Sequence, residues 1–285
     1  SDASWELPAG VTLTDMVIEA LRPADPMVSY SSVDIQIYDS AVNPHDGRLY
    51  ILLDDDLLHL DARSQKPIVD IETGIMGRSL AIDSDVGALL IGTEDGSVLS
   101  RSLYDSSEML NLRESTGIQN AGIYSITVDD YGTVWAAGNC SILFKPMGED
   151  VWSEYNYCQT PNIETPSDMM IIADSVYLAT TNTGVHILDY TTSSSSGSVS
   201  VTIDSQTDWS TQNFLSSDQI TDLEVVGNHL LIATADSGIN RRDLTAQSWI
   251  ATWSTSNWLA SNQIHGLSLT PGWLHILAGT TVHAY

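Results

Sequence analysis

The stretches DWSTQNFLSSDQITDL (residues 208–223) and TWSTSNWLASNQIHGL (residues 252–267) are two copies of one sequence unit. The copies align without gaps, with the pairs Trp209/Trp253, Asn213/Asn257, Phe214/Trp258 and Ile220/Ile264. A match of this length between two segments of one chain indicates an internal repeat.

The same unit recurs in weaker form along the chain. Each copy has an alternating apolar strand, a short turn, a second apolar strand, a loop of small or acidic residues, and a third strand. Six copies begin near residues 34, 78, 123, 168, 219 and 263. Short strands of period two, repeated about every 40–45 residues, are typical of a β-propeller. We therefore predict an all-β chain whose single domain, residues 1–285, is a six-bladed β-propeller with four-stranded blades.

The last copy has only three predicted strands. Near the start of the chain, Ser4-Trp5-Glu6-Leu7 resembles Ser248-Trp249-Ile250-Ala251, the predicted fourth strand of the fifth copy. We therefore predict that residues 1–33 form a closing strand for the last blade and an arm that crosses to the first, which removes two exposed sheet edges. The alternatives are an incomplete propeller and a seventh, partial blade formed by residues 11–33.

Charge and composition exclude several classes of partner. The chain has 37 Asp and Glu against 10 Lys and Arg, a formal net charge of -27. This balance argues against binding nucleic acid, which needs a cationic surface, and against anionic lipid surfaces. The longest apolar runs have the length of strands, so we predict no membrane insertion. An Asp-rich, Lys-poor surface suits a marine or halophilic source, and an acidic mesophilic protein is the alternative.

The two cysteines fall in the third copy. Cys140 begins its predicted third strand and Cys158 ends the fourth, with a hairpin turn between them. In a tight hairpin the two residues face each other, so we predict a disulfide and an oxidising compartment outside the cytoplasm. The alternative is two buried free thiols in adjacent strands.

One stretch points to a known family. Residues 123–144 read IYSITVDDYGTVWAAGNCSILF: an apolar strand, an acidic pair with Gly, an aromatic residue and a small-residue loop. This pattern resembles the two-component-regulator propeller repeat. The resemblance implies a propeller from the extracellular sensor region of a membrane kinase, or a module of a secreted protein, that binds a ligand or a partner.

The loops between second and third strands carry oxygen-bearing side chains in every copy. Because these loops gather near the central channel of a propeller, we predict a ring of candidate ligand-binding residues. Its members are Asp54, Asp55, Asp56, Glu94, Asp95, Asn139, Asn182, Asp236 and Thr280. Such a ring suits sugar hydroxyls or a hard cation, with calcium at Asp54, Asp55 and Asp56 if a metal binds, and we expect no other cofactor. The alternative is that these are ordinary turn residues.

The aromatic residues of the repeat have two interpretations. Trp209 and Trp253 fall at the ends of fourth strands, and Phe214 and Trp258 fall in the connections that follow. An exposed ring at such a place stacks on a sugar. Repetition instead favours packing between blades, because each blade of one type needs the same contact.

No motif for catalysis is present. The sequence lacks a Gly-x-Ser-x-Gly elbow, a phosphate-binding loop and a zinc-binding His spacing, and His59, His186 and His283 fall in separate blades. We predict a non-enzymatic module that binds a protein or carbohydrate ligand, extracellular or periplasmic at the cell surface, as a monomer or as one domain of a larger protein. The alternatives are a propeller enzyme of glycosidase, lyase or lactonase type, and a purely structural role.

Overall fold

The structure is a computed structural model that describes ten segments of the chain. These are residues 37–53, 56–60, 67–72, 76–104, 109–113, 122–158, 164–195, 198–270, 273–279 and 281–284. All regular elements in these segments are β-strands. Within the same segments no helix is long and apolar enough to cross a membrane.

The strands form six antiparallel sheets in chain order, each a simple meander. The first sheet has β1 (Ile37–Val42), β2 (Leu49–Leu53), β3 (Asp56–Leu60) and β4 (Pro67–Glu72). The second has β5 (Gly77–Asp83), β6 (Ala88–Thr93), β7 (Val98–Ser102) and β8 (Met109–Arg113). The third has β9 (Ile123–Val128), β10 (Val134–Gly138), β11 (Ser141–Lys145) and β12 (Ser153–Asn156).

The fourth sheet has β13 (Pro166–Ile172), β14 (Ser175–Thr180), β15 (Val185–Ser195) and β16 (Ser198–Trp209). The fifth has β17 (Ile220–Val226), β18 (His229–Thr234), β19 (Ile239–Asp243) and β20 (Ser248–Trp253). The last has β21 (Ile264–Thr270), β22 (Trp273–Ala278) and β23 (Thr281–Ala284).

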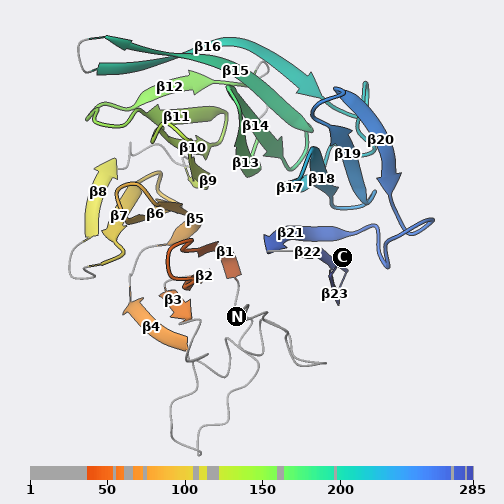
Figure 1. Ribbon diagram of the computed structural model, residues 1–285, viewed down its shortest axis with the longest axis horizontal. Helices are drawn as coiled ribbons and strands as arrows, with labels where there is room; N and C mark the ends of the chain where they lie inside the picture. Colours follow the sequence, from red (N-terminus) through yellow and green to blue (C-terminus); the bar gives the residue numbers. More distant parts are fainter. Residues whose placement is uncertain are drawn as a thin grey trace, which may run out of the picture.

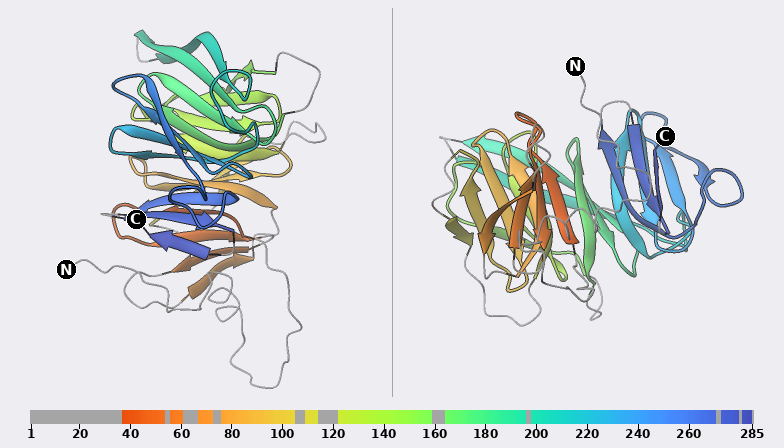
Figure 2. Two further views of the ribbon diagram at one scale, coloured as in Figure 1. Left: turned by 90° about the vertical axis from the view of Figure 1, so that its right-hand side faces the viewer. Right: turned by 90° about the horizontal axis from the view of Figure 1, so that it is seen from below.

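The sheets follow one another round a common centre, with the first strand of each sheet innermost (Figure 1). Seen from the side, they stack face to face as in a β-propeller (Figure 2). The prediction of six four-stranded blades is wrong, as is that of seven. The described residues form five four-stranded blades, and the last repeat adds only a three-stranded sheet. The predicted closing strand and arm, residues 1–33, lie outside the described residues.

The core lies between the sheets rather than within one of them. Five hydrophobic clusters join successive sheets, from the first to the sixth. Second strands supply most of this core, because they lie in the interior of each blade and are covered on both faces. In β6 and β10 every residue is buried. These strands therefore read as continuous apolar or small-residue runs.

The innermost strands are sheet edges, and their N–H groups that point toward the centre of the ring have no ladder partner among the described strands. Carboxylates of the preceding blade accept some of these hydrogens. Asp39 Oδ2 accepts from Leu80 N at 2.7 Å, and Asp222 Oδ2 accepts from Leu267 N at 2.6 Å. Each carboxylate also accepts the N–H of the residue that follows it, as in Asp39 Oδ1 with Ser40 N at 2.7 Å. These bonds connect adjacent blades at the centre of the ring.

A β-bulge comes just before these carboxylates. In each innermost strand the pairing register shifts within its first three residues, as at Pro166/Asp168 and Ile220/Asp222. A bulge re-aims the side chains around it. The repeated bulge therefore gives the residue at this position the same orientation in every blade.

The predicted disulfide is confirmed. Cys140 and Cys158 are bonded, with their Cα atoms 4.9 Å apart. Cys140 lies in the turn between β10 and β11 and adopts a φ of 60°. The bond joins this turn to the end of β12, so it fastens the inner and outer parts of the third blade together.

Two glycines after β14 and β18 occupy equivalent places. Gly184 has a φ of +93°, and an added Cβ would lie 2.0 Å from Trp209 O. Gly238 has a φ of +87°, and its Cβ would lie 2.1 Å from Trp253 O. Each turn therefore presses against the end of its own blade's outermost strand, and only glycine fits there.

We predict that Gly184→Ala and Gly238→Ala each lower the free energy of unfolding by about 2 kcal/mol or more, because the new methyl group meets backbone. Gly227→Ala is the matched control. Gly227 also has a positive φ, +59°, but has open space around its missing Cβ. Urea unfolding of the three variants measures the difference. Equal losses in all three would contradict the close approach.

Candidate functional site

The predicted ring of loop residues is distributed over separate blades. Glu94, Asp95, Asn139, Asn182 and Asp236 all follow second strands, in the second to fifth sheets. Asp54, Asp55 and Thr280 lie outside the described residues, and Asp56 begins β3.

Two of these residues have hydrogen-bond or ion-pair partners within the second sheet and its turn. Asp95 Oδ1 accepts hydrogen bonds from Thr93 Oγ1 and Ser97 N, and these bonds lower the pKa of its carboxyl. Glu94 forms an ion pair of 2.8 Å with Arg78. Asn182 and Asp236 are exposed. In the part of the chain that the structure describes, no three metal-binding side chains converge. A calcium site at Asp54–Asp56 stays a prediction, because its loop lies mostly outside that part.

Among the described residues, the carboxyl groups with raised pKa values lie on the innermost strands. Burial raises the pKa of Asp39 from 3.8 to about 7, against the opposing effect of its two backbone hydrogen bonds. Burial also raises the pKa of Glu224, whose Oε2 accepts from Leu269 N at 3.1 Å. Narrow packing at the centre of a propeller therefore favours the neutral form of these acids.

Asp168 and Asp222 form a close carboxyl pair at this centre. Leu223 N donates to Asp168 Oδ2 at 3.0 Å and to Asp222 Oδ1 at 2.8 Å. Burial raises the pKa of both residues, and the negative charge of Asp168 raises that of Asp222 further. Both effects favour a pair that shares one proton over a pair with two charges.

Shifted pKa values are common in active sites, but these carboxylates already have a structural role. Their oxygens accept backbone N–H groups of their own strand and of the next blade. This accounts for their presence without a substrate. We therefore assign them to blade assembly.

A second cluster combines a histidine with two acids. His186 on β15 lies 2.6 Å from Glu164 Oε2 through Nε2 and 2.6 Å from Asp208 Oδ1 through Nδ1. Thr183 and Gln206 donate to the same two carboxylates. Both ring nitrogens of His186 are thus engaged by carboxylates within the protein. The cluster ties the segment before β13 to the end of β16.

Two matching loops present aromatic side chains at the edge of the molecule. The loops are residues 210–219, after β16, and residues 254–263, after β20. Asn213 accepts from Ser210 N at 2.7 Å and donates to Asp208 O at 2.8 Å. Asn257 makes the same pair of bonds in the second loop, at 2.8 and 2.9 Å. The shared Trp-Ser-Thr-x-Asn sequence thus fixes one loop shape twice.

The residue after each asparagine faces solvent. Phe214 is 51% exposed and Trp258 is 65% exposed. Phe214 stacks on Trp249 of β20, with ring centroids 5.7 Å apart and an interplanar angle of 18°. Trp258 leans on Trp253 at 6.5 Å. Each of these two rings is in contact with a second aromatic ring on one side and is exposed to solvent on the other.

An arginine lies over each of the two tryptophan rings, Trp249 and Trp253, that contact the exposed rings. The guanidinium of Arg242 lies 5.4 Å from the ring centroid of Trp249, and that of Arg241 lies 4.5 Å from that of Trp253. Trp249 packs between the fourth and fifth sheets and Trp253 between the fifth and sixth, so the two sets of side chains lie on opposite faces of the fifth sheet. We call the two sets together the aromatic ledge. Its members are Phe214, Trp249, Trp253, Trp258, Arg241 and Arg242.

The repeated aromatic residues fall into two groups, one buried and one exposed. Trp209 is 5% exposed and packs on Trp249 at 5.0 Å, so its interpretation as blade packing is correct. Phe214 and Trp258 instead point outward. Sequence reasoning did not single out the inner carboxylates. The signal for them was an Asp recurring near the start of three predicted first strands, at Asp39, Asp168 and Asp222.

No family model matches the chain, and a search of curated proteins finds no match either. Solved structures with similar folds exist at low sequence identity. The extracellular domain of the putative one component system BT4673 from B. thetaiotaomicron has a TM-score of 0.63 at 15% identity over 88% of this chain. The chain spans 33% of that protein chain.

Two further structures match over 89% of this chain. U3-55K has a TM-score of 0.64 at 11% identity, with 78% of its chain covered. The WD40 β-propeller domain of Doa1 has a TM-score of 0.59 at 12% identity, with 93% covered. These likenesses establish the β-propeller fold. The resemblance to the two-component-regulator repeat stays a prediction at the level of family.

The inner carboxylates predict a pH dependence of stability. A raised pKa means that the native state binds more protons than the unfolded chain, so stability is present below pH 3.8 and is lost as pH rises through about 7. Asp39→Asn replaces this titrating carboxyl group with an amide. We therefore expect the difference in Tm, wild type minus variant, to shrink from about pH 5 to about pH 8.

Asp236→Asn, at an exposed loop position, is the matched control and should show no such trend. Both differences are measured by thermal unfolding in one series of buffers at constant ionic strength. Because the remaining charges are common to all proteins compared, the general repulsion of an acidic chain cancels. A difference in Tm between the wild type and Asp39→Asn that stays constant with pH would contradict the prediction.

Proposed function

We propose that this chain is a non-enzymatic binding module that recognises a protein partner through the aromatic ledge. The observation that carries the proposal is the exposure of Phe214 and Trp258 on rigid, matching loops, each backed by a second aromatic ring. A folded chain gains nothing by leaving two large rings in water. Their burial by a partner supplies binding energy.

The residue types favour protein over a small molecule. Trp, Phe and Arg are enriched in the central contacts of protein interfaces, where a few aromatic anchors supply most of the affinity. Phe214 and Trp258 project outward from loops at the rim of the sheets, and the other members of the ledge lie on β19 and β20. Small-molecule sites are usually concave.

Charge indicates the kind of partner. With a net charge of -27, two copies of this chain repel each other, so a second copy is a poor occupant. The same field attracts a basic protein from a distance. At contact, Arg241 and Arg242 offer donors to carbonyl or carboxylate oxygens of the partner. We therefore propose a basic segment with an apolar centre.

The proposed location is outside the cytoplasm, on a secreted or cell-surface protein. The Cys140–Cys158 disulfide supports an oxidising compartment, since such bonds seldom persist in the cytosol. The fold similarity to an extracellular domain of a one component system is consistent with this location.

The proposal predicts that selection from a random dodecapeptide display library yields peptides with aromatic or aliphatic centres flanked by Lys or Arg. Trp258→Ala and Phe214→Ala should each weaken these peptides by roughly 10–100-fold, the usual loss for a central aromatic anchor. Isothermal titration measures the affinities.

Tyr131→Ala is the matched control, because Tyr131 is also exposed, at 58%, but lies in the turn between β9 and β10 at the opposite rim. A glycan array is screened in parallel. Enriched peptides that bind all three variants equally would refute the ledge as the site. A glycan lost on Trp258→Ala, with no peptide enriched, would replace the protein partner by a carbohydrate.

A further inference from the structure

The rim opposite the loops of Phe214 and Trp258 also carries exposed apolar side chains. This rim holds the turns between first and second strands and those between third and fourth strands. In the second and third blades, five apolar residues of these turns are more than half exposed. They are Val86 at 59%, Tyr104 at 79%, Tyr131 at 58%, Met147 at 54% and Val151 at 73%. Single exposed apolar residues are ordinary, whereas a group of them on neighbouring turns indicates a binding surface. We call these five residues the turn surface.

The second and third blades build the turn surface in the same way. A Cβ added at Gly87 would meet the ring of Tyr104, and one added at Gly132 would meet the side chain of Met147. Each glycine lies in the first turn of its blade, and each apolar side chain belongs to the second turn. The two turns of a blade are therefore packed together, and the side chain that joins them keeps most of its surface in water.

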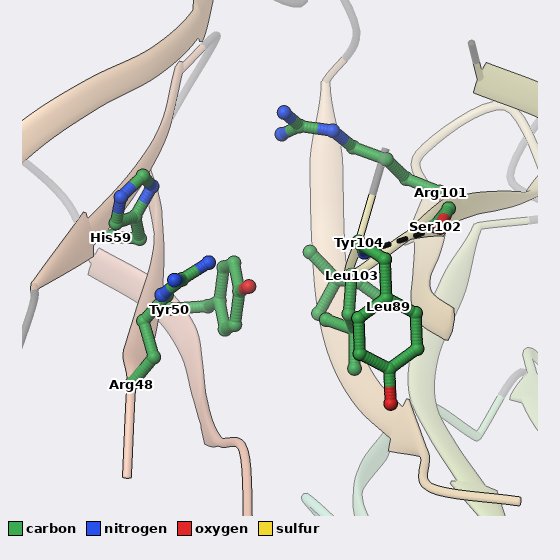
Figure 3. A pocket seen from close by; sticks show the side chains of 8 residues that line it. All are labelled: Arg48, Tyr50, His59, Leu89, Arg101, Ser102, Leu103 and Tyr104. Atoms are coloured by element: carbon green, nitrogen blue, oxygen red, sulfur yellow. Dashed lines mark hydrogen bonds between the residues drawn. The ribbon is translucent and has the colours of Figure 1, made fainter. Parts of the chain in front are cut away.

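The two blades are adjacent, and the turn surface ends at a recess beside the first blade. Trp152 Nε1 donates to Leu112 O at 3.0 Å, which joins the outer parts of the third and second blades. On the other side, Figure 3 shows Tyr104 across a pocket of about 140 Å³ from Arg48 and Tyr50 of the first blade. The ring of Tyr104 therefore packs on Gly87 and also borders open space.

The same rim is polar in the fourth and fifth blades. The first turns there are Ala173-Asp174 and Gly227-Asn228, and the second turn of the fifth blade exposes Thr245, Ala246 and Gln247. Among the described residues of these turns, no large apolar side chain is exposed. The apolar character is therefore specific to the second and third blades and is not a requirement of the repeat.

An acidic side chain accompanies the apolar ones. Three exposed aspartates directly precede members of the turn surface, in the pairs Asp85-Val86, Asp130-Tyr131 and Asp150-Val151. A complementary partner therefore has apolar side chains flanked by Lys or Arg. The net charge of -27 attracts such a partner from a distance, and the three aspartates attract it at contact.

The backbone of these turns favours a contact through side chains. Asp83 Oδ1 accepts from Asp85 N and from Val86 N, at 3.1 Å each. Asp129 Oδ1 accepts from Tyr131 N at 2.9 Å. Addition of a strand needs a row of open backbone groups, and these N–H groups are bonded within their own turns. An amphipathic helix instead presents apolar and charged side chains together, with its backbone groups paired internally.

We propose that the turn surface binds a basic amphipathic helix of a protein partner. The five apolar residues contact the apolar face of the helix, and Asp85, Asp130 and Asp150 pair with Lys or Arg beside that face. The turn surface shares no residue with the aromatic ledge. Either site can therefore fail without the other, and the proposed function of the ledge does not depend on this one.

The test is isothermal titration of the whole chain with a synthetic Leu/Lys peptide whose leucines fall at positions i, i+3, i+4 and i+7. Tyr104→Ala and Met147→Ala should each weaken binding roughly tenfold, because each removes a central apolar contact. Asp130→Asn should weaken it by only about twofold to threefold, because an exposed ion pair contributes little. The titrations are made at one physiological ionic strength, on variants whose Tm matches that of the wild type.

Val282→Ala and Asp204→Asn are the matched controls, because both side chains are exposed and lie on strands away from these turns, β23 and β16. The control ligand is a peptide of the same composition with its leucines spread round the helix. Binding that only the turn-surface variants weaken, and that the control peptide lacks, supports the proposal.

Three results would overturn it. Equal binding of the two peptides, or equal effects of all variants, would report general attraction to an acidic protein. Binding that Trp258→Ala removes and Tyr104→Ala leaves intact would assign the helix to the ledge. Self-association in sedimentation experiments that Tyr104→Ala abolishes would make a second copy of this chain the occupant.

Discussion

The architecture depends on how the inner edge of each sheet is satisfied. An innermost strand presents backbone N–H groups toward the centre, where none of the described strands lies to accept them. Asp39, Asp168 and Asp222 accept these hydrogens from the following blade, at 2.6–3.0 Å. Between the second and third blades the direction of the hydrogen bond is reversed, because here the side chain donates, from Ser79 Oγ to Ile123 O. Hydrophobic clusters hold the blades together, and these polar bonds set their spacing at the centre.

This solution concentrates acids where water is scarce. Neutral or shared-proton forms are then favoured, as the raised pKa values of Asp39, Asp168, Asp222 and Glu224 show. Assembly thus accounts for the carboxylates at the centre of the ring, whereas the predicted ring of ligand-binding loop residues stays a prediction. Gly266 holds the matching position on β21 and has no side chain with which to bind a further blade.

Recognition is therefore proposed for the outside of the ring rather than for its centre. The aromatic ledge lies where the loops after β16 and β20 emerge. Its side chains differ in charge and polarity from most of this acidic chain. Aromatic rings and arginines gather in a chain whose charge is overwhelmingly negative.

Local pattern was enough for much of this description. The Trp-Ser-Thr repeats and period-two strands predicted a propeller, and the Cys140–Cys158 hairpin predicted the disulfide, because these features depend on residues close in sequence. The count of four-stranded blades failed. It assumed a fourth strand for the last repeat from the likeness of Trp5 and Trp249, and a likeness of short segments carries no information on pairing.

The sequence by itself determined the repeat, the strand periodicity, the turn residues and the acidity of this protein, because each is encoded within a few neighbouring positions. Only the tertiary structure decided which side chains meet across blades. Asp168 and Asp222 are 54 positions apart and share a backbone hydrogen, and Arg48 and Arg101 line one pocket from different sheets. Such contacts depend on how one blade packs on the next, and no spacing within a single repeat records that.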